Sequence, residues 1–233
     1  MRIAVSRVLE HFDGKLDGKR VLDAPAGIGW VGDELARAGA EAVYGDINNE
    51  KSYFTHVDLE EPLPFDDCSF DAIVCCEGIE HVYSPWLLLS ELKRVLRPGG
   101  VIVITTPNVQ NLLSRLKFLF CGYLYQFEPF SKVPQEFGDK GHISPVGYWQ
   151  LDYYCQCLGL MVRQPSGGRL KRLILLPFFI PLLGLGWLWS YLDHLKFGKR
   201  NRTAGSRILG NMFRLRVLLS RSLVFVATAP TES

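Results

Sequence analysis

Short apolar runs alternate with helical patterns through the first two thirds of the 233-residue chain. The apolar runs predict strands at 20–23, 41–45, 69–76, 101–105 and 160–164, and a last strand at 222–228. The helical patterns predict helices at 3–12, 31–38 and 86–96, the last of these capped by Ser84 with Pro85 at its first position. This alternation predicts an open α/β sheet.

One connection in this pattern is unusually short. Only about six residues separate Asp46, just past the second strand, from the next strand-like run at 53–57. A parallel crossover normally needs a dozen or more residues, usually in a helix. We therefore expect the 53–57 run to be either a frayed edge strand or a strand that pairs in an unusual way.

The stretch VLDAPAGIGW at 21–30 combines a strand, a loop of small residues and the start of a helix. Gly27 and Gly29 let the backbone approach a ligand closely, because they lack Cβ and tolerate positive φ. Residues 27–32 also fit the G-x-G-x-x-G pattern, which would place a pyrophosphate at the helix N-terminus. Asp23 argues against that reading, since a carboxylate repels a pyrophosphate and attracts a cation. The sulfonium and ammonium groups of S-adenosylmethionine therefore suit this loop better than NAD.

The Asp-x-x-x-Gly-x-Gly pattern formed by Asp23, Gly27 and Gly29 resembles motif I of the class I S-adenosylmethionine-dependent methyltransferases. The chain resembles the second half of the same family in a later series of elements. These are a strand, an acidic loop, a helix, the Leu-Arg-Pro-Gly-Gly turn at 96–100 and another strand. The family usually has glycine in place of Pro25, so we expect a stiffer loop here. The resemblance implies a Rossmann-like sheet of about seven strands, with the last one antiparallel and the cofactor at the C-terminal edge. A hydrophobic helical insertion would precede that last strand.

The resemblance and the residue types together define an expected cofactor site. Asp46 follows the second strand, where an acidic side chain can accept both ribose hydroxyls in either nucleotide reading. Resembling methyltransferases hold the adenine at the position of Asp58 and Leu59, and Glu77 would line the pocket at a strand end. The expected cofactor-binding residues are Asp23, Ala24, Gly27, Gly29, Asp46, Asp58, Leu59 and Glu77.

His142 is the candidate catalytic residue. Methyl transfer from a sulfonium requires alignment of donor and acceptor and, for a hydroxyl acceptor, removal of a proton. His142 lies just before a helix predicted to start at Ser144 and Pro145, and it could act as the general base. A structural role for this histidine is the alternative. The aromatic-rich segment at 111–130 predicts either a packed helix or, as in the resembling family, a lid on the substrate side.

A metal site is an alternative interpretation of nearby residues. The Glu77-x-x-Glu80-His81 arrangement resembles one in ubiquinone-biosynthesis O-methyltransferases and small-RNA 2′-O-methyltransferases, where such side chains bind a divalent metal. His142 would be a further ligand. Similar segments occur in many relatives where no metal role is known, so we predict no bound metal.

Composition narrows the class of protein. The 48% hydrophobic fraction is ample for a core, and a net charge of +2 gives no argument for nucleic acid. The six cysteines follow no disulfide framework, and we expect no signal peptide, so a reducing cytoplasm is the expected location. Cys75 and Cys76, adjacent in an apolar strand, are expected to face opposite sides of the sheet.

A hydrophobic block separates the final two predicted strands. Residues 173–192 are almost uninterruptedly apolar, with basic residues on both flanks and Trp187, Trp189 and Tyr191 near one end. The segment 205–219 predicts a single amphipathic helix with Arg207 and Arg214 on a basic stripe that extends to Arg221. We expect a monotopic protein that dips into the cytoplasmic leaflet without crossing it. Burial of both helices against the domain or a partner is the alternative.

These expectations define a domain organisation and a function. The divisions are a methyltransferase domain at 1–165, an insertion at 166–221, and the final strand and tail at 222–233. The expected function is S-adenosylmethionine-dependent O-methylation of a small or lipid-linked acceptor at the membrane surface, without nucleic acid. The alternatives are an NAD-dependent oxidoreductase and a non-catalytic, membrane-tethered binding protein with a degenerate cofactor fold.

Overall fold

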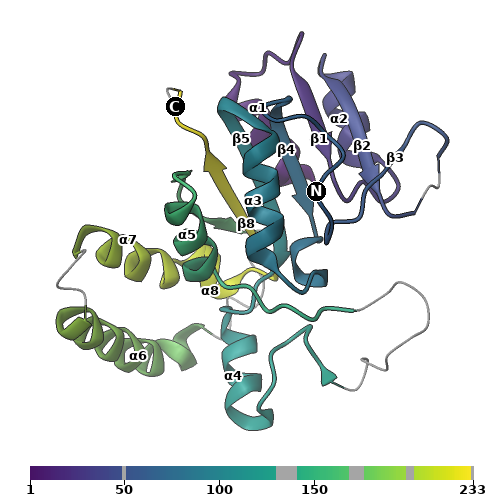
Figure 1. Cartoon of the computed structure of the whole chain (residues 1–233). Helices are drawn as coiled ribbons and strands as arrows, with labels where there is room; N and C mark the ends of the chain where they lie inside the picture. The colour runs from purple at the N-terminus through teal and green to yellow at the C-terminus, as the bar shows by residue number, and fades with distance from the viewer. Residues whose placement is uncertain (49–50, 130–140, 168–175, 198–201, 232–233) are drawn as a thin grey trace.

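The computed structural model of the chain describes residues 1–48, 51–129, 141–167, 176–197 and 202–231. It contains a twisted sheet in the order β3-β2-β1-β4-β5-β8-β6, with the short β7 also paired to β8 (Figure 1). The bounds of the strands are β1 Arg20–Asp23, β2 Glu41–Asp46, β3 Thr55–His56, β4 Phe70–Cys76, β5 Leu96–Pro107, β6 Met161–Val162, β7 Ser166–Gly167 and β8 Ser222–Thr228. The first five strands pair in parallel and β8 runs antiparallel to β5, which confirms the predicted fold class.

Helices cover both faces of this sheet. Helices α1 (Arg2–His11) and α2 (Trp30–Arg37) pack on one face, whereas α3 (Pro85–Val95) and α5 (Tyr148–Cys157) pack on the other. The buried β4 supplies side chains to both layers, with Cys75 in one core cluster and Cys76 in the other, as predicted. All six cysteines are described and are free thiols.

The short connection after β2 ends in a minimal edge strand. β3 contributes two residues, and these pair in parallel with Gly45 and Asp46 at the end of β2. Because the pairing starts only at the last residues of β2, the chain does not have to return along the whole strand. The frayed-edge prediction is therefore confirmed, and β3 delivers the residues after it to the C-terminal edge of the sheet.

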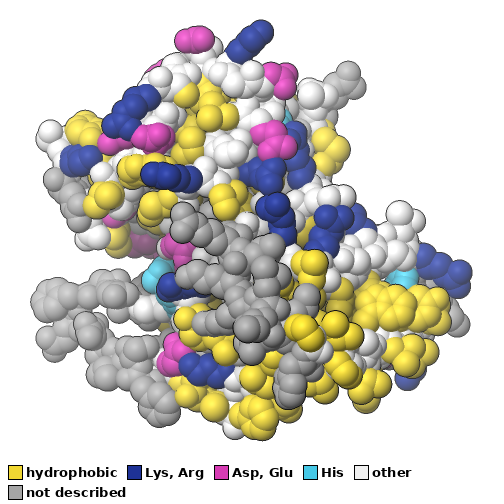
Figure 2. Space-filling view, turned by 180° about the vertical axis from the view of Figure 1, so that it is seen from behind, with side chains coloured by type: hydrophobic (Ala, Val, Ile, Leu, Met, Phe, Trp, Pro, Cys, Tyr) yellow, Lys and Arg dark blue, Asp and Glu magenta, His cyan; other side chains and the backbone are white. Residues whose placement is uncertain are grey.

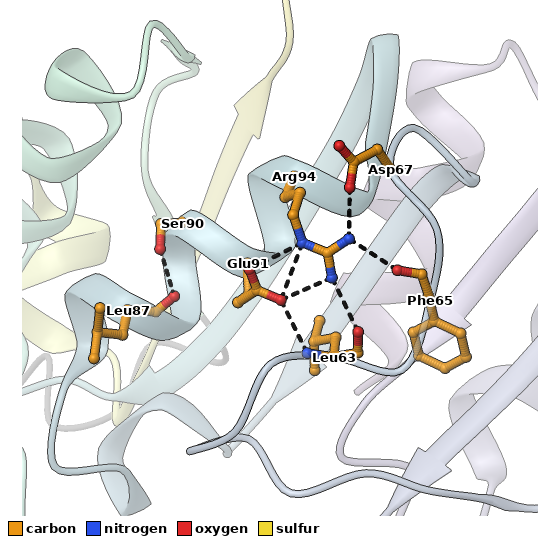
Figure 3. Close-up of polar contacts among 7 residues, drawn as sticks. All are labelled: Leu63, Phe65, Asp67, Leu87, Ser90, Glu91 and Arg94. Carbon is orange, nitrogen blue, oxygen red and sulfur yellow. Dashed lines mark hydrogen bonds and ion pairs between the residues drawn. The ribbon is translucent and has the colours of Figure 1, made fainter.

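Arg94 fastens the link between β3 and β4 to helix α3 (Figure 3). Its guanidinium donates to the carbonyl oxygens of Leu63 and Phe65, each at 2.9 Å, and to Glu91 at 2.8 Å. Glu91 in turn accepts a 2.9 Å bond from the backbone N–H of Leu63. This set of contacts fixes the segment that leads from the edge strand back into the core.

Helix α5 starts later than predicted. Ser144 does not cap it: the Ser144 hydroxyl donates to the carbonyl of Val82 at 2.6 Å, and its backbone N–H donates to the carbonyl of Glu80 at 2.9 Å. These bonds tie the segment to the 3₁₀ turn η1 (Ile79–His81) and to the residue after it, and α5 begins at Tyr148 instead. The same contacts determine where His142 lies.

A second half of the molecule, below the sheet in Figure 1, contains α4 (Leu112–Cys121), α6 (Leu176–Phe197), α7 (Arg202–Met212) and α8 (Leu215–Leu219). The prediction of one amphipathic helix at 205–219 is wrong. Arg214 has extended backbone angles (φ −66°, ψ 140°), which separate α7 from α8. The three arginines of the expected stripe therefore lie on α7, before α8 and after α8, and do not share one helical face.

Helix α6 contains residues 176–192 of the hydrophobic block predicted at 173–192, and residues 173–175 lie outside the described residues. Asn108, which follows β5, connects the sheet to α8 because its side-chain amide donates to the carbonyls of Val217 (2.6 Å) and Ser220 (3.1 Å).

Among the helices of the described residues, none combines the length and the apolar character that spanning a membrane requires.

Candidate active site

The loop between β1 and α2 is shaped by two glycines with left-handed backbones. Gly27 has φ 53° and Gly29 has φ 82°, a region that residues with a Cβ rarely adopt. A Cβ built on Gly27 would meet no atom within 4 Å, so space is open beside the loop at this point. Gly29 is the N-cap of α2, so the N-terminal end of that helix follows the loop directly.

Asp23 lies at the base of this loop and is almost fully buried. Its Oδ2 atom accepts a 2.8 Å hydrogen bond from the backbone N–H of Gly32. Its Oδ1 atom has no hydrogen-bond partner among the described residues. Burial raises the pKa of Asp23 to about 7, and the charge of Asp46 adds to the rise, whereas the bond from Gly32 lowers it. A cationic ligand would favour the ionised form, so this group fits the methionine end of S-adenosylmethionine.

Asp46 connects the ends of the first two strands. One carboxylate oxygen accepts a 2.7 Å bond from the N–H of Gly27 and the other a 2.9 Å bond from the N–H of Asn48. Each oxygen keeps a second lone pair that could accept a ribose hydroxyl. Ala24, also buried, donates its N–H to the carbonyl of Val74 and so holds the loop on β4.

Asp58 and Leu59 come shortly after β3, beyond Val57, and are half-buried. Asp58 Oδ1 accepts a 2.9 Å bond from the N–H of Glu60, which closes a local turn, and Leu59 packs against the larger core cluster. Because β3 pairs with the end of β2, this turn lies at the same edge of the sheet as Asp46. The arrangement suits the predicted adenine position, which remains a prediction.

Glu77 adopts a left-handed backbone (φ 52°), which is uncommon for a residue with a side chain. Two bonds hold it: its N–H donates to the carbonyl of Thr105 at 2.8 Å, and Thr105 Oγ1 donates to Glu77 Oε1 at 3.0 Å. The next residue, Gly78, packs against the glycine loop, since a Cβ there would come within 2.5 Å of Pro25 Cδ. Pro25, which stands where the family usually has glycine, therefore fits because Gly78 has no side chain at the point of contact.

The carboxylate of Glu80 is fully buried, and neither oxygen has a hydrogen-bond partner among the described residues. Burial raises its pKa to about 8, and the charge of Glu77 adds to the rise. The rings of His81 and His142 lie beside it, with centroids 4.9 Å apart. Glu80, His81 and His142 each bring a possible ligand atom within 4.8 Å of the others. The structure thus assembles the donor set of the metal alternative without Glu77, which bonds to Thr105 instead.

The tautomer of His142 follows from its partner. His142 Nδ1 lies 2.8 Å from the carbonyl oxygen of Gln126, which can only accept. Nδ1 therefore carries a proton, and an unprotonated Nε2 could accept a proton from a substrate or bind a metal. The segment before α5 also bonds to the η1 turn, which lies far from it in the sequence.

An aromatic wall beside the glycine loop was missed by sequence reasoning. Tyr44 and Phe54 stack with centroids 5.3 Å apart, and Tyr44 donates a 2.9 Å hydrogen bond to Asp33 at the start of α2. Lys51 Nζ donates to the carbonyl of Ile28 in the loop itself, at 2.8 Å. The sequence signal that could have indicated this wall is the pair of aromatic residues, Tyr44 and Phe54, on either side of the short β2–β3 connection.

Comparison with known proteins identifies the family. A sequence profile described as "Methyltransferase domain" matches residues 22–104. The chain is 37% identical over 124 residues to a demethylmenaquinone methyltransferase of Clavibacter sepedonicus, covering 46% of this chain and 49% of that protein. It is 30% identical over 179 residues to a ubiquinone biosynthesis O-methyltransferase of Neisseria meningitidis serogroup C, covering 68% of this chain and 71% of that one. The chain thus spans about half the length of the first of these relatives.

The solved structures agree in fold. A methyltransferase structure from Archaeoglobus fulgidus, described as dependent on S-adenosylmethionine, superimposes with a TM-score of 0.57 at 20% identity, covering 97% of this chain and 93% of that one. The matched family, together with the buried Asp23 and the glycine loop, excludes the NAD alternative and assigns S-adenosylmethionine as the cofactor. The chain belongs to the class I S-adenosylmethionine-dependent methyltransferases.

Proposed function

We propose that the protein methylates a hydroxyl oxygen of a lipid-linked acceptor, of the quinone-precursor type, at a membrane surface. The observation that carries this proposal is an exposed apolar surface shared by α4 and α6, which we call the α4–α6 face. Its members are large hydrophobic side chains that remain open to solvent: Phe118, Leu119, Phe120, Ile180, Leu182, Leu185, Trp187, Leu188, Trp189, Tyr191, Leu192 and Leu195. A monomer seldom leaves so many of these together in water.

The α4–α6 face lies on the half of the molecule that carries the insertion. Figure 2 shows hydrophobic side chains gathered over this lower half, in contrast to the mixed surface of the sheet half. Trp189 and Phe120 are 73% and 77% exposed, so the helices do not bury them against the domain. Such aromatic and leucine side chains are typical of surfaces that insert into the headgroup region of a bilayer.

Charge also supports attraction to an anionic membrane. Residues 166–221 contain eleven Lys and Arg and one Asp, a net charge of +10, while the rest of the chain carries −8. A strongly asymmetric charge of this kind orients a protein toward an anionic surface.

A small, mostly apolar cavity between α4 and α6 could take a few methylene groups of an acceptor's hydrocarbon chain. The cavity has a volume of about 90 Å³ and lies between α4, the start of α6 and α8, with Leu112, Phe179 and Leu218 in its lining. Asn111 and Arg221, close to the end of β5, also line it. The cavity therefore lies where the ends of β5 and α8 meet the two apolar helices.

The roles of the residues follow from the geometry of the site. S-adenosylmethionine, when bound, supplies an electrophilic methyl group with a good leaving group. Asp23 and Asp46 would hold the cofactor through the carboxylate atoms described above. His142 Nε2 would accept the proton of the acceptor hydroxyl, while Nδ1 stays bonded to the carbonyl of Gln126 and keeps the ring oriented.

Vesicle flotation tests the membrane part of this proposal. The full chain is floated with vesicles of phosphatidylcholine alone and with phosphatidylglycerol added. We expect flotation only with the anionic vesicles, and its loss in the variant Leu119→Ser/Phe120→Ser. The matched control is Trp149→Ser, an exposed aromatic on α5 outside the α4–α6 face. The control should float like the parent. If all three proteins stay in the soluble fraction when anionic vesicles are present, the proposal is contradicted.

A divalent cation at Glu80, His81 and His142 is a second candidate for activating the hydroxyl. The unpartnered, buried carboxylate of Glu80 favours it, because a cation would neutralise the charge that burial opposes. Under this alternative, chelation would abolish transfer and Mg²⁺ or Zn²⁺ would restore it. Under the His142 base mechanism, thorough chelation would leave the rate unchanged.

A further inference from the structure

Four arginines from three segments line one pocket on the α1 side of the sheet. Arg7 comes from α1, Arg163 follows β6, Arg214 precedes α8, and Arg216 lies on α8. The pocket has a volume of about 320 Å³, within the range of small-molecule sites. None of its lining residues belongs to the glycine loop or to the cluster around Glu80.

The positive charge in this pocket is largely uncompensated. Glu10 is the acidic residue in the lining, and it pairs with Arg7. No ion pair to Arg163, Arg214 or Arg216 occurs among the described residues. Arg163, Arg214 and Arg216 are exposed, and like charges that line one pocket repel one another, so an anion between them would be attracted.

The partner of Arg163 is neutral. Arg163 donates a 2.8 Å bond to His11 Nδ1, while His11 Nε2 lies 3.0 Å from the carbonyl of Gly99 and must donate to it. One nitrogen therefore accepts and the other donates, which is the neutral form of the ring. Burial lowers the pKa of His11 and favours the same form. The guanidinium is thus oriented by a contact that leaves its charge intact.

A polar group already lies in the pocket without a partner. Ser166, on β7, is 4% exposed and lines the pocket, yet its hydroxyl has no hydrogen-bond partner among the described residues. A buried hydroxyl without a partner costs free energy unless a ligand or water satisfies it. Lys and Arg side chains also gather at the waist between the two halves of the molecule in Figure 2.

We propose that Arg7, Arg163, Arg214, Arg216 and the Ser166 hydroxyl form a binding site for a phosphate-bearing anion. Guanidinium groups bind phosphate oxygens through paired N–H donors, and a serine hydroxyl can add a further bond. The ligand is either a soluble phosphate or diphosphate compound or the phosphate of an anionic lipid headgroup. Both present the same chemistry to the pocket.

Two binding measurements on the full chain separate these sources. Calorimetry with inorganic pyrophosphate tests the soluble ligand, and flotation with phosphatidylglycerol vesicles tests the headgroup. The variant is Arg163→Gln/Arg214→Gln, and Arg202→Gln, an exposed arginine on α7 outside the pocket, is the matched control. Thermal melting of all three proteins verifies folding, and Ser166→Ala provides a variant with no change in charge.

We expect the double variant to weaken one of these two interactions at least about tenfold, the loss of one or more charge-assisted bonds. Ser166→Ala should weaken the same interaction less, and Arg202→Gln should leave it unchanged. If the double variant binds pyrophosphate more weakly, the ligand is a soluble phosphate compound. If only its flotation is reduced, the ligand is a lipid headgroup. If neither interaction changes in the folded double variant, the site does not exist.

Discussion

The guanidinium of Arg207 on α7 donates a 3.0 Å hydrogen bond to Oδ2 of Asp152 on α5, a carboxylate that is fully buried. Tyr148 donates to the other oxygen of Asp152 at 3.2 Å, and Asn211 on α7 donates to the Tyr148 hydroxyl at 2.7 Å. These bonds fasten α7 to α5 through a polar network around the buried carboxylate of Asp152.

Removing the charge of Arg207 should loosen this attachment. In Arg207→Met, the buried Asp152 loses its cationic partner, and we expect the free energy of unfolding to fall by about 1–3 kcal/mol. Urea denaturation measures the change, and limited proteolysis should show faster cleavage within α6 and α7. Arg202→Met on the same helix is the control and should stay within about 0.5 kcal/mol of the parent. Equal effects of the two substitutions would show that the network is dispensable.

Two glycine substitutions should have opposite effects on stability. A Cβ on Gly32 would come within 2.3 Å of Tyr44 Cε1, so Gly32→Ala must displace the aromatic wall beside the cofactor loop. We expect a loss of about 1–3 kcal/mol in the free energy of unfolding, with weaker cofactor binding. Gly184 in α6 has no atom within 4 Å of a built Cβ, and Gly184→Ala should gain about 0.5–1 kcal/mol. Thermal melting and calorimetry with S-adenosylhomocysteine measure both; a stable Gly32→Ala with full affinity would refute the close packing.

The sheet could be predicted closely from the sequence, because its signals are local. The bounds predicted for β1 and β8 match the structure, and the glycine loop, Asp46 and the cap at Ser84 follow from residue types at fixed spacing. Ser84 accepts a 3.3 Å bond from the N–H of Leu87, as the cap requires. These features depend on short-range backbone geometry, which composition and periodicity report well.

Features that depend on distant contacts could not be predicted in the same way. The start of α5 and the position of His142 are determined by bonds to Glu80 and Val82, about 60 residues earlier. The break before α8 occurs within an amphipathic pattern that continues across it, so periodicity alone predicts one helix. The basic pocket brings together Arg7 and Arg163, which are far apart in the sequence, and no local motif indicates that.

The Arg94 contacts in Figure 3 predict a pH-dependent contribution to stability. The hydrogen bond from Arg94 lowers the pKa of Glu91 below its usual value. A carboxyl group with a lowered pKa stabilises the fold at pH values above its pKa in the unfolded chain, about 4.3. This contribution is lost as the pH falls through the pKa of the folded state. Arg94→Met should therefore cost about 1–3 kcal/mol at pH 7 and less in acid. Lys93→Met on the same helix is the control; a deficit independent of pH would rule out the ion pair as its cause.

Asp23 predicts how cofactor affinity changes with pH. Burial raises its pKa from 3.8 to about 7, so in the free protein its stabilising contribution is present below about pH 4 and is lost as the pH rises through about 7. A bound cation favours the ionised carboxylate. Affinity for S-adenosylmethionine should therefore rise about tenfold per pH unit below 7 and level off above it. Calorimetry between pH 5.5 and 8.5 measures this, with Asp23→Asn expected to bind weakly and without the dependence. Glu80→Gln, which removes the other carboxyl with a raised pKa, should keep the parental profile.

Transfer of a labelled methyl group into membrane lipids tests the central claim most directly. The full chain is incubated with S-adenosylmethionine carrying a labelled methyl group and a lipid extract, and the label is followed into the organic phase. The account predicts a base-stable, ether-type product, abolished in Asp23→Asn and reduced about 100-fold or more in His142→Gln. Cofactor binding without any transfer would favour the non-catalytic alternative. Label found only in the aqueous phase, or an organic product formed equally by both variants, would contradict O-methylation of a lipid-linked acceptor at this site.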